Sequence, residues 1–206
     1  MKRLLFILLA FTLYAQQPYT PGCDQIVTHG KYTLCYSEKH EQAKWVSYTL
    51  EIESLMCKKH RKNDFRSDPL ITTGSASVSD YRGSEYDRGH LAPAADFCDV
   101  SSTFFMSNMS PQKPRFNRGV WKRLEEWVRN QVRLGGAIKV VTGPVLNDNL
   151  KTIGKNKVSV PEFYYKVIIG DGFTIAFFIP NHRSMSRVSS FMVPIDSVEA
   201  ITGIKF

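Results

Sequence analysis

One amphipathic segment, residues 117–136, restricts what this 206-residue chain can fold into more than any other stretch. At the helical period of about 3.6 residues, one face of the segment carries Trp121, Leu124, Val128, Gln131 and Val132. Two glycines, Gly135 and Gly136, end the pattern. A helix with one apolar face needs a second layer to cover it, so we predict one long helix, about residues 117–134, packed on a sheet.

Strand patterns lie on both sides of that helix. Before it, Val46, Tyr48, Leu50 and Ile52 alternate with polar residues at the period of a half-buried strand. After it come three further apolar runs, of which the last two are joined by a hairpin signal, Gly170-Asp171-Gly172: residues 137–143, 163–169 and 173–180. Strands, a helix and strands again indicate a single α+β domain with a central, mainly antiparallel sheet.

The first residues are typical of a secretory signal peptide. Lys2 and Arg3 precede an apolar run that ends at Ala15, a small residue at a plausible cleavage point. That run is shorter than the roughly 20 apolar residues that a membrane-spanning helix needs. We therefore expect residues 1–15 to be a signal peptide, residues 16–22 an N-terminal arm and residues 23–206 the domain. The protein would be exported, to the periplasm or the medium, with no membrane anchor after cleavage.

The chain is basic, with a formal net charge of +8, of which cleavage after Ala15 would remove two cations. Such an excess favours polyanionic partners such as nucleic acids, although charge alone does not establish them. In an exported protein the four cysteines suggest disulfides, with three possible connectivities. We favour Cys23–Cys35 with Cys57–Cys98, and free thiols are the alternative.

A long polar stretch, residues 57–88, has little apolar periodicity and reads as a loop, a kind of segment that often carries function. It runs directly into the sequence YDRGHLAP, residues 86–93. His90 is a natural general base there, because an imidazole exchanges protons near neutral pH. Gly89 would let the backbone bend or a phosphate approach. A lone histidine in a loop is more often structural, so His90 needs support from a second motif.

That support comes from the predicted helix. Asn117 and Glu125 are eight residues apart, which places them within about 80° of each other on an α-helix. One amide oxygen, with waters held by a nearby carboxylate, is a sensible ligand set for Mg²⁺. The alternatives are an N-cap role for Asn117 and an ion pair between Glu125 and Arg129. Glu126 competes with Glu125 for the carboxylate role.

The sequence YDRGHLAPAADF, followed by FFMSNMSPQKPRFNRGVWKRLEE, resembles the signature of the DNA/RNA non-specific endonucleases, a family of ββα-metal nucleases. The resemblance extends over nearly the whole chain after the first 15 residues. It implies that Asn117 binds the metal directly and that Glu125 orders its water ligands. It also favours Glu125 over Glu126.

Two arginines complete the expected site. Arg61 matches a family arginine that contacts the phosphate, and Arg88 stands within the DRGH motif; a guanidinium fork suits two phosphoryl oxygens. A solvated basic run is the alternative for Arg61. Asp87 is interpreted as an orienting residue.

Five neighbours of these residues are given other roles. Pro111 and Gln112 are expected to shape a metal-side turn, and Asn108 is a second-tier ligand candidate. Trp121 and Trp127 are expected in the core rather than as platforms on which bases stack.

The sequence thus predicts an exported, Mg²⁺-dependent endonuclease, with Mn²⁺ as a substitute, that cuts DNA and RNA into products with 5′-phosphates. His90, Arg61, Arg88 and Glu125 are its candidate catalytic residues, Arg61 and Arg88 bind the substrate, and Asn117 and Glu125 hold the metal. A non-catalytic protein for DNA capture or uptake is one alternative. A phosphodiesterase for small nucleotides or a targeted toxin nuclease is another. Whether the protein is a monomer or a homodimer stays undecided.

Overall fold

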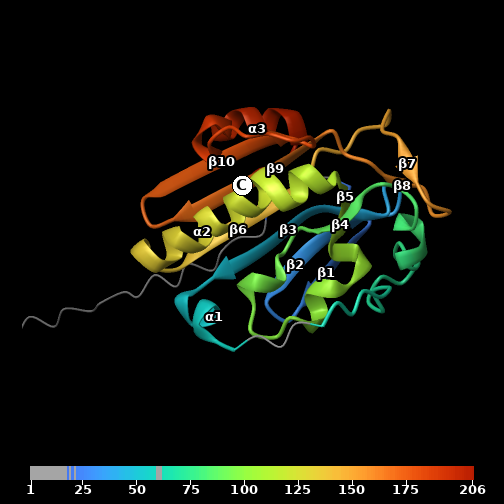
Figure 1. Ribbon diagram of the computed structural model, residues 1–206, viewed down its shortest axis with the longest axis horizontal. Helices are drawn as coiled ribbons and strands as arrows, with labels where there is room; N and C mark the ends of the chain where they lie inside the picture. The colour runs from blue at the N-terminus through green and yellow to red at the C-terminus, as the bar shows by residue number, and fades with distance from the viewer. Residues whose placement is uncertain (1–17, 19, 21, 59–61) are drawn as a thin grey trace, which may run out of the picture.

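The computed structural model describes residue 18, residue 20, residues 22–58 and residues 62–206. Its centre is a seven-stranded sheet in the order β1-β2-β3-β6-β9-β10-β11, in which every neighbouring pair is antiparallel (Figure 1). These strands are Gln25–His29, Tyr32–Ser37, Gln42–Leu50, Ile138–Pro144, Phe163–Gly170, Phe173–Pro180 and Met192–Val193. The predicted α+β class with a mainly antiparallel sheet is confirmed.

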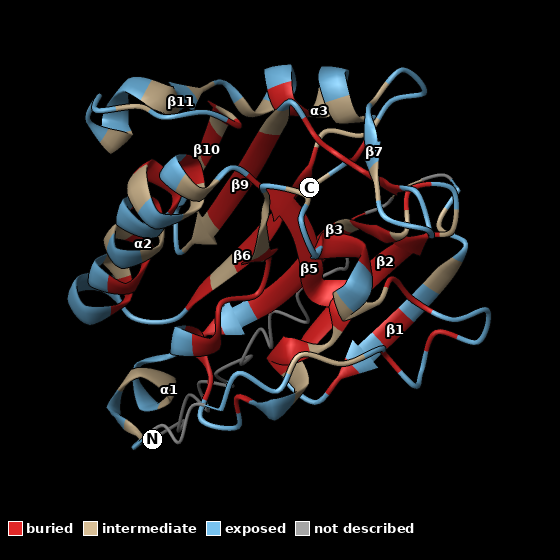
Figure 2. Ribbon diagram, turned by 45° about the vertical axis from the view of Figure 1, so that its right-hand side comes forward, coloured by how far each residue is buried: buried red, intermediate tan, exposed pale blue. Residues whose placement is uncertain are grey.

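Both faces of the sheet are covered, and the alternation of side chains along the strands separates two cores. In β3, Val46 belongs to the core on the α2 side (Lys122–Gly135), whereas Trp45 belongs to the core on the α3 side (Ile195–Thr202). Figure 2 shows the buried centre of the sheet and the exposed outer surface of α2. Because β3 is buried on both faces, its polar Ser47 is buried too.

The long helix is confirmed, but its first part is not α-helical. Residues Phe116–Trp121 form a π-helical turn, in which the Lys122 N–H donates to the carbonyl of Asn117. The α-helix α2 follows and ends where Gly136 adopts a φ of 87°. The predicted apolar face is largely buried: Trp121, Leu124, Val128 and Val132 are in the core. Trp127 packs on Phe177 with ring centroids 5.3 Å apart, as expected for a core residue.

Shorter elements complete the fold. They are α1 (Ile52–Met56), the hairpin of β4 (Asp87–His90) and β5 (Met109–Gln112), and the small hairpin of β7 (Thr152–Ile153) and β8 (Val158–Ser159). The predicted turn between residues 169 and 173 joins β9 to β10 as expected. In the described residues no helix is long and apolar enough to cross a bilayer.

One local expectation is wrong. Ile52 lies not in a strand but at the start of α1, because β3 ends at Leu50. The spacing of Asp196 and Glu199 matches a capping box, but no such box forms, since Pro194 is the N-cap of α3. Glu199 instead accepts hydrogen bonds from Lys205 and from the Phe206 N–H, which fixes the last residues against the helix.

The cysteines form two disulfides, Cys23–Cys35 and Cys57–Cys98, and none is free. This is the favoured pairing of the three. The second disulfide ties the start of the long loop to the segment after the DRGH motif. The expected signal peptide, residues 1–15, lies outside the described residues, as does most of the expected arm at residues 16–22.

Candidate active site

The two sequence motifs meet in a ββα unit. Strand β4, which is the DRGH tetrapeptide, pairs antiparallel with β5, and Asp87 lies opposite Gln112 and His90 opposite Met109. The long helix follows β5 directly. Residues that are about 30 positions apart in the chain, Asp87 and Asn117, thereby come within hydrogen-bonding distance, 2.9 Å.

Asp87 is the link between strand and helix. Its carboxylate accepts a hydrogen bond from Asn117 Nδ2 and two from the Arg118 guanidinium, at 2.9 and 2.6 Å. Because Nδ2 is engaged, the orientation of the Asn117 amide is fixed and Oδ1 is the atom left to bind a ligand. The interpretation of Asp87 as an orienting residue agrees with these contacts.

Asn117 is not the N-cap of the helix, because it lies inside the π-helical turn and its own N–H donates to Lys113. The rotation of about 80° expected between Asn117 and Glu125 assumed an uninterrupted α-helix. The extra residue of the π turn changes that angle. Such turns are frequent at functional sites. Here the carbonyl of Asn117 itself accepts the i→i+5 hydrogen bond, from the Lys122 N–H.

Arg88 and His90 lie on the other face of β4 from Asp87, since successive side chains of a strand alternate. Both contact Phe65: the Arg88 guanidinium carbon is 4.3 Å from the ring centroid, and the two rings of His90 and Phe65 are 5.8 Å apart. Phe104 packs edge-on against His90 at 4.9 Å. Two aromatic rings therefore hold the imidazole and the guanidinium side by side.

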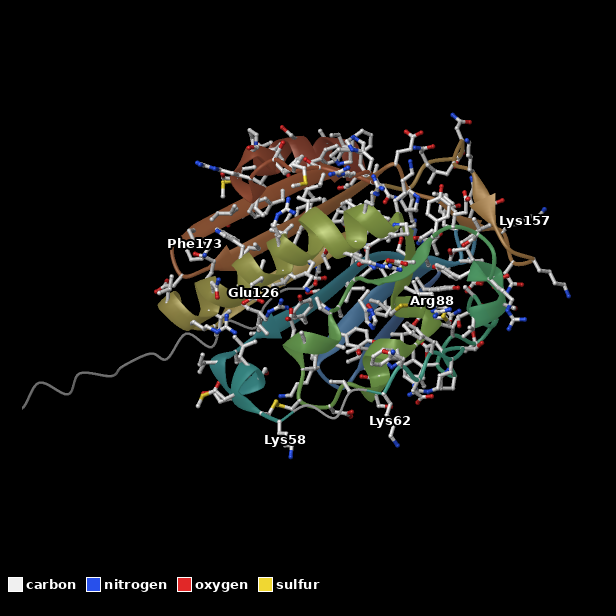
Figure 3. All side chains as sticks on the ribbon, viewed as in Figure 1. Lys58, Lys62, Arg88, Glu126, Lys157 and Phe173 are labelled. Atoms are coloured by element: carbon white, nitrogen blue, oxygen red, sulfur yellow. A yellow bond between two sulfur atoms is a disulfide. The ribbon has the colours of Figure 1, made fainter. Side chains whose placement is uncertain are left out.

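The Nε of Arg88 is buried and has no hydrogen-bond partner among the described residues. A buried donor without an acceptor is costly in a folded protein. A guanidinium placed in this way fits an external anion that supplies the acceptor. Figure 3 shows Arg88 among the side chains beside β4.

Gly89 has another role than the expected one. Its φ is not positive, and it is buried. A Cβ built there would lie 2.2 Å from the side-chain amide carbon of Gln112. The glycine is needed because Gln112 fills the space over it, not because the backbone bends or a phosphate approaches. Pro111 and Gln112 correspondingly belong to strand β5 rather than to a turn.

Asn108 is structural. It is fully buried, and its Oδ1 accepts from the Ala92 N–H while its Nδ2 donates to the carbonyls of Ala92 and Thr103. These bonds hold the loop after the DRGH motif in place. They remove Asn108 from the candidate metal ligands.

The two competing carboxylates on α2 differ clearly. Glu126 is engaged by Arg129 at 2.9 Å and by Arg133 at 3.2 Å, and hydrogen bonding from Arg129 lowers its pKa. Arg129 also pairs with the buried Asp96. The carboxylates that Arg129 pairs with are thus those of Glu126 and Asp96.

Glu125 is half-buried beside a buried lysine, Lys166. Burial lowers the pKa of Lys166 to about 8, while the charges of Glu125 and Asp96 act in the opposite direction. The Lys166 ammonium also lies 4.6 Å from the centroid of the Trp121 ring. The sequence pattern missed this lysine, because it stands in an apolar strand with nothing to mark it.

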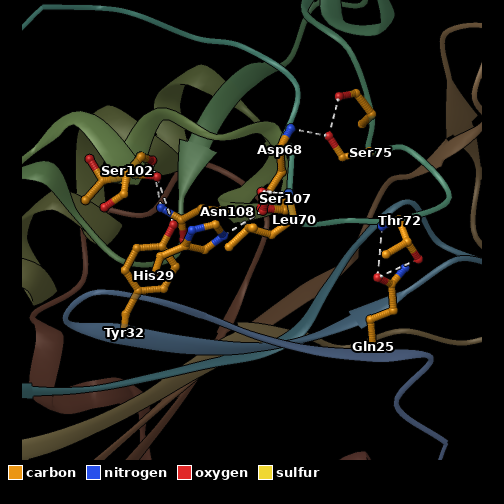
Figure 4. Close-up of polar contacts among 12 residues, drawn as sticks. Gln25, His29, Tyr32, Asp68, Leu70, Thr72, Ser75, Ser102, Ser107 and Asn108 are labelled. Atoms are coloured by element: carbon orange, nitrogen blue, oxygen red, sulfur yellow. Dashed lines mark hydrogen bonds and ion pairs between the residues drawn. The ribbon is translucent and has the colours of Figure 1, made fainter.

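The long loop before β4 is anchored by one buried aspartate (Figure 4). Asp68 lies 2.7 Å from His29 Nε2 of β1 and accepts from the Ser107 hydroxyl and the Leu70 N–H. Burial acts to raise the pKa of Asp68, but the hydrogen bonds, that of His29 foremost, outweigh it and lower the pKa. From residue 62 onward this loop is therefore an ordered wall of the candidate site, which brings Phe65 against β4.

Arg61 lies outside the described residues, so its expected phosphate contact stays a prediction. Its neighbours Lys58 and Lys62 are exposed and point away from the body of the protein (Figure 3). Arg66, five residues on, pairs with Asp64 at 2.9 Å.

The donors present fit a hard divalent cation. No cluster of three or more His, Cys, Asp or Glu side chains that could enclose a metal occurs in the described residues. What β4 and the helix offer is one oriented amide oxygen of Asn117 and oxygen-only carboxylates. That set suits an ion that keeps most of its waters, as Mg²⁺ does, rather than zinc.

An imidazole and a guanidinium with a free Nε on strand β4, with an oriented amide oxygen on the helix that follows the hairpin, suit the hydrolysis of a phosphodiester. Fold and site thus define a ββα nuclease, an enzyme of the phosphodiester hydrolase class. The chain belongs to the DNA/RNA non-specific endonuclease family, which matches residues 10–206.

Known relatives support this assignment. The chain is 33% identical over 209 residues to the mitochondrial endonuclease G of Bos taurus, covering 90% of this chain and 70% of the relative. It is 34% identical over 203 residues to a nuclease of Nostoc sp., covering 89% and 73%. A crystal structure of an EndoG/EndoGI complex matches with a TM-score of 0.82 and 32% identity, covering 91% of this chain and 87% of that one.

Proposed function

We propose that this endonuclease is exported, depends on Mg²⁺ and cuts both DNA and RNA with little sequence preference. The observation that carries the proposal is the pair formed by the buried, unpartnered Arg88 Nε and the oriented Asn117 amide, which together suit a phosphate and its cation. Weak specificity follows from the same chemistry, because phosphate contacts position a nucleic acid without reading its sequence.

Each residue has one task in the proposed mechanism. Arg88 and Arg61 bind the non-bridging phosphate oxygens. His90 accepts a proton from water as the water oxygen attacks phosphorus, and the bond from phosphorus to O3′ breaks to leave a 5′-phosphate. Phe65 and Phe104 keep the imidazole in its place.

Asn117 would hold the metal through Oδ1, and Glu125 would order the water ligands, with Asp87 fixing the amide. The bound cation, Mg²⁺ with Mn²⁺ as a substitute, would stabilise the negative charge that develops on the phosphoryl and leaving oxygens.

Degradation of plasmid DNA and of RNA by the wild type and by His90→Ala tests the activity, each with Mg²⁺ and with a chelator. We expect the wild type to cut both polymers only with metal, and His90→Ala to lose about 10²- to 10⁴-fold. Circular dichroism shows whether the variant is folded. A wild type that binds but never cuts would instead support the alternative of a DNA-capture protein.

Export is tested separately, because residues 1–15 carry it. Expressed with its full sequence in a bacterial host, the protein should appear in the periplasm or medium with Gln16 as its first residue. N-terminal sequencing of the recovered protein gives the answer. An intact Met1 on cell-retained protein would overturn export without affecting the activity.

A further inference from the structure

A groove rich in arginine lies beside the candidate metal site. It has a volume of about 580 Å³ and is bordered by the start of the long helix and by residues 183–185. We call it the arginine groove, after its four arginines, Arg115, Arg118, Arg123 and Arg183. No carboxylate is among the described residues that line it.

The π-helical turn places the helix arginines together. Arg118 and Arg123 are five residues apart, and an uninterrupted α-helix would turn them about 140° away from each other. The turn with i→i+5 bonding between them adds a residue, so both line one groove. Gly119 lies between them with open space where its side chain would be. The irregular helix start therefore gathers positive charge on one side.

Two of the four arginines are held by the protein. Arg118 donates twice to Asp87, and Arg123 donates to the carbonyls of Ser184 and Ser186, at 3.2 and 3.1 Å. The second contact fixes the segment that carries Arg183 against the helix. These two arginines thus form the walls of the groove.

The other two arginines are available to a partner. Arg115 and Arg183 are exposed, and neither makes an ion pair or a side-chain hydrogen bond within the described part of the chain. Guanidinium groups that face a shared hollow without internal partners suit bidentate binding of phosphate oxygens.

The groove adjoins the candidate metal site through Arg118. This residue lines the groove and donates hydrogen bonds to Asp87, whose carboxylate also accepts from Asn117. A molecule bound in the groove would therefore lie close to Asn117, the residue proposed to hold the metal. This proximity favours the substrate itself over an unrelated acidic protein as the occupant.

We propose that the arginine groove binds the backbone phosphates of the nucleic-acid strand beyond the phosphate that is cut, through Arg115 and Arg183. This inference rests on the proposed function. It predicts that affinity and turnover grow with strand length until the groove is filled, and that two ionic contacts with the strand belong to these residues.

The test uses binding of a labelled 30-nucleotide single-stranded DNA by fluorescence anisotropy across a series of salt concentrations. The parent protein is His90→Ala, which should cut the probe about 10²- to 10⁴-fold more slowly than the wild type, and the test protein adds Arg115→Ala and Arg183→Ala. The slope of log affinity against log salt should become shallower by about 1.4, or about 0.7 for each lost phosphate contact. Affinity at low salt should fall roughly tenfold.

A matched control removes the same charge elsewhere. In Lys31→Ala with Lys205→Ala, one exposed lysine comes from the β1–β2 turn at the far edge of the sheet and the other from the α3 side. This control should keep the slope of the parent. Thermal unfolding of all proteins by circular dichroism shows that a change in slope is not a loss of fold.

Cleavage gives a second readout, measured in proteins that keep His90. Arg115→Ala with Arg183→Ala should raise the KM for the 30-nucleotide strand more than it lowers kcat, and the loss should be smaller for a dinucleotide, which is too short to span the groove. If the slope of log affinity against log salt and the dependence of cleavage on strand length both equal those of the lysine control, the arginine groove does not bind the strand. The proposed nuclease activity would be unaffected by that result. A wild type that never cuts would overturn both.

Discussion

The side-chain Nδ2 of Asn117 donates a hydrogen bond of 2.9 Å to the Asp87 carboxylate, and this bond joins the helix to the strand that carries Arg88 and His90. Asp87 is half-buried and also accepts two hydrogen bonds from Arg118. A carboxylate held from both sides sets the direction of the amide, and with it the place where a cation can bind.

Removing that carboxylate should weaken metal use. We expect Asp87→Ala to lower activity by about 10- to 100-fold and to raise the Mg²⁺ concentration needed for half-maximal cleavage, because outer partners of metal ligands typically have effects of that size. Asp87→Asn should recover part of the loss, since its amide oxygen can still accept from Asn117. Titration of plasmid cleavage with Mg²⁺ measures both. Asp171→Ala, at the exposed β9–β10 turn, is the control, and an unchanged Mg²⁺ dependence in Asp87→Ala would contradict the role.

The close packing of Gln112 over Gly89 predicts that a methyl group added at Gly89 lowers the free energy of unfolding. In Gly89→Ala the new Cβ would meet the Gln112 side chain at 2.2 Å, so we expect a loss of about 1–3 kcal/mol in the free energy of unfolding. Gln112 makes no side-chain hydrogen bond within the described residues, so its truncation relieves the clash at small cost in hydrogen bonding.

The double variant Gly89→Ala with Gln112→Ala should therefore recover most of the stability. Urea unfolding of the wild type, the two single variants and the double variant gives the coupling free energy between the two substitutions. Additive losses would show that the clash is not the cause.

Substitutions of the neighbouring residues Glu125 and Glu126 should affect activity differently, because only Glu125 is proposed to act at the metal. Glu126 is engaged by two arginines, so Glu126→Gln should keep activity within about twofold, as for an ordinary surface substitution. Glu125→Gln should lose about 10- to 100-fold and shift the Mg²⁺ dependence. Initial rates at several Mg²⁺ concentrations distinguish the two. Equal losses in both variants would assign the effect to helix stability instead.

Lys166 predicts a pH dependence of stability. Burial lowers its pKa to about 8 in the folded protein, below the ordinary value of 10.5. Between these values the unfolded chain binds a proton that the folded chain does not, so the contribution of Lys166 to stability rises with pH above about 8.

Lys166→Met should abolish this rise and should be at least as stable as the wild type at pH 7, because no buried charge remains. The comparison is made by thermal unfolding between pH 7 and 9.5, below the range in which the buried tyrosines, whose pKa values burial raises, begin to affect the result. Parallel profiles for the two proteins would contradict the lowered pKa.

The amphipathic helix, the β9–β10 hairpin and the α+β class could be predicted because each depends on a local period of apolar residues. The candidate residues Asp87, Arg88, His90 and Asn117 could be named because their residue types and motif spacing are readable in the chain. Glu125 was preferred to Glu126 only through the resemblance to the endonuclease family. Ile52 was misplaced, because where β3 ends depends on the neighbours that pack there.

The sequence by itself determined the two halves of the site, since imidazole, guanidinium and amide chemistry belong to the residues. Only the tertiary structure decided how the halves meet. A π-helical turn at Asn117, a glutamine that fills the space over Gly89 and an aspartate that bonds across to the helix all result from packing between segments far apart in the chain. No local period can specify such contacts, because they form only when the sheet, the loop and the helix compete for the same space.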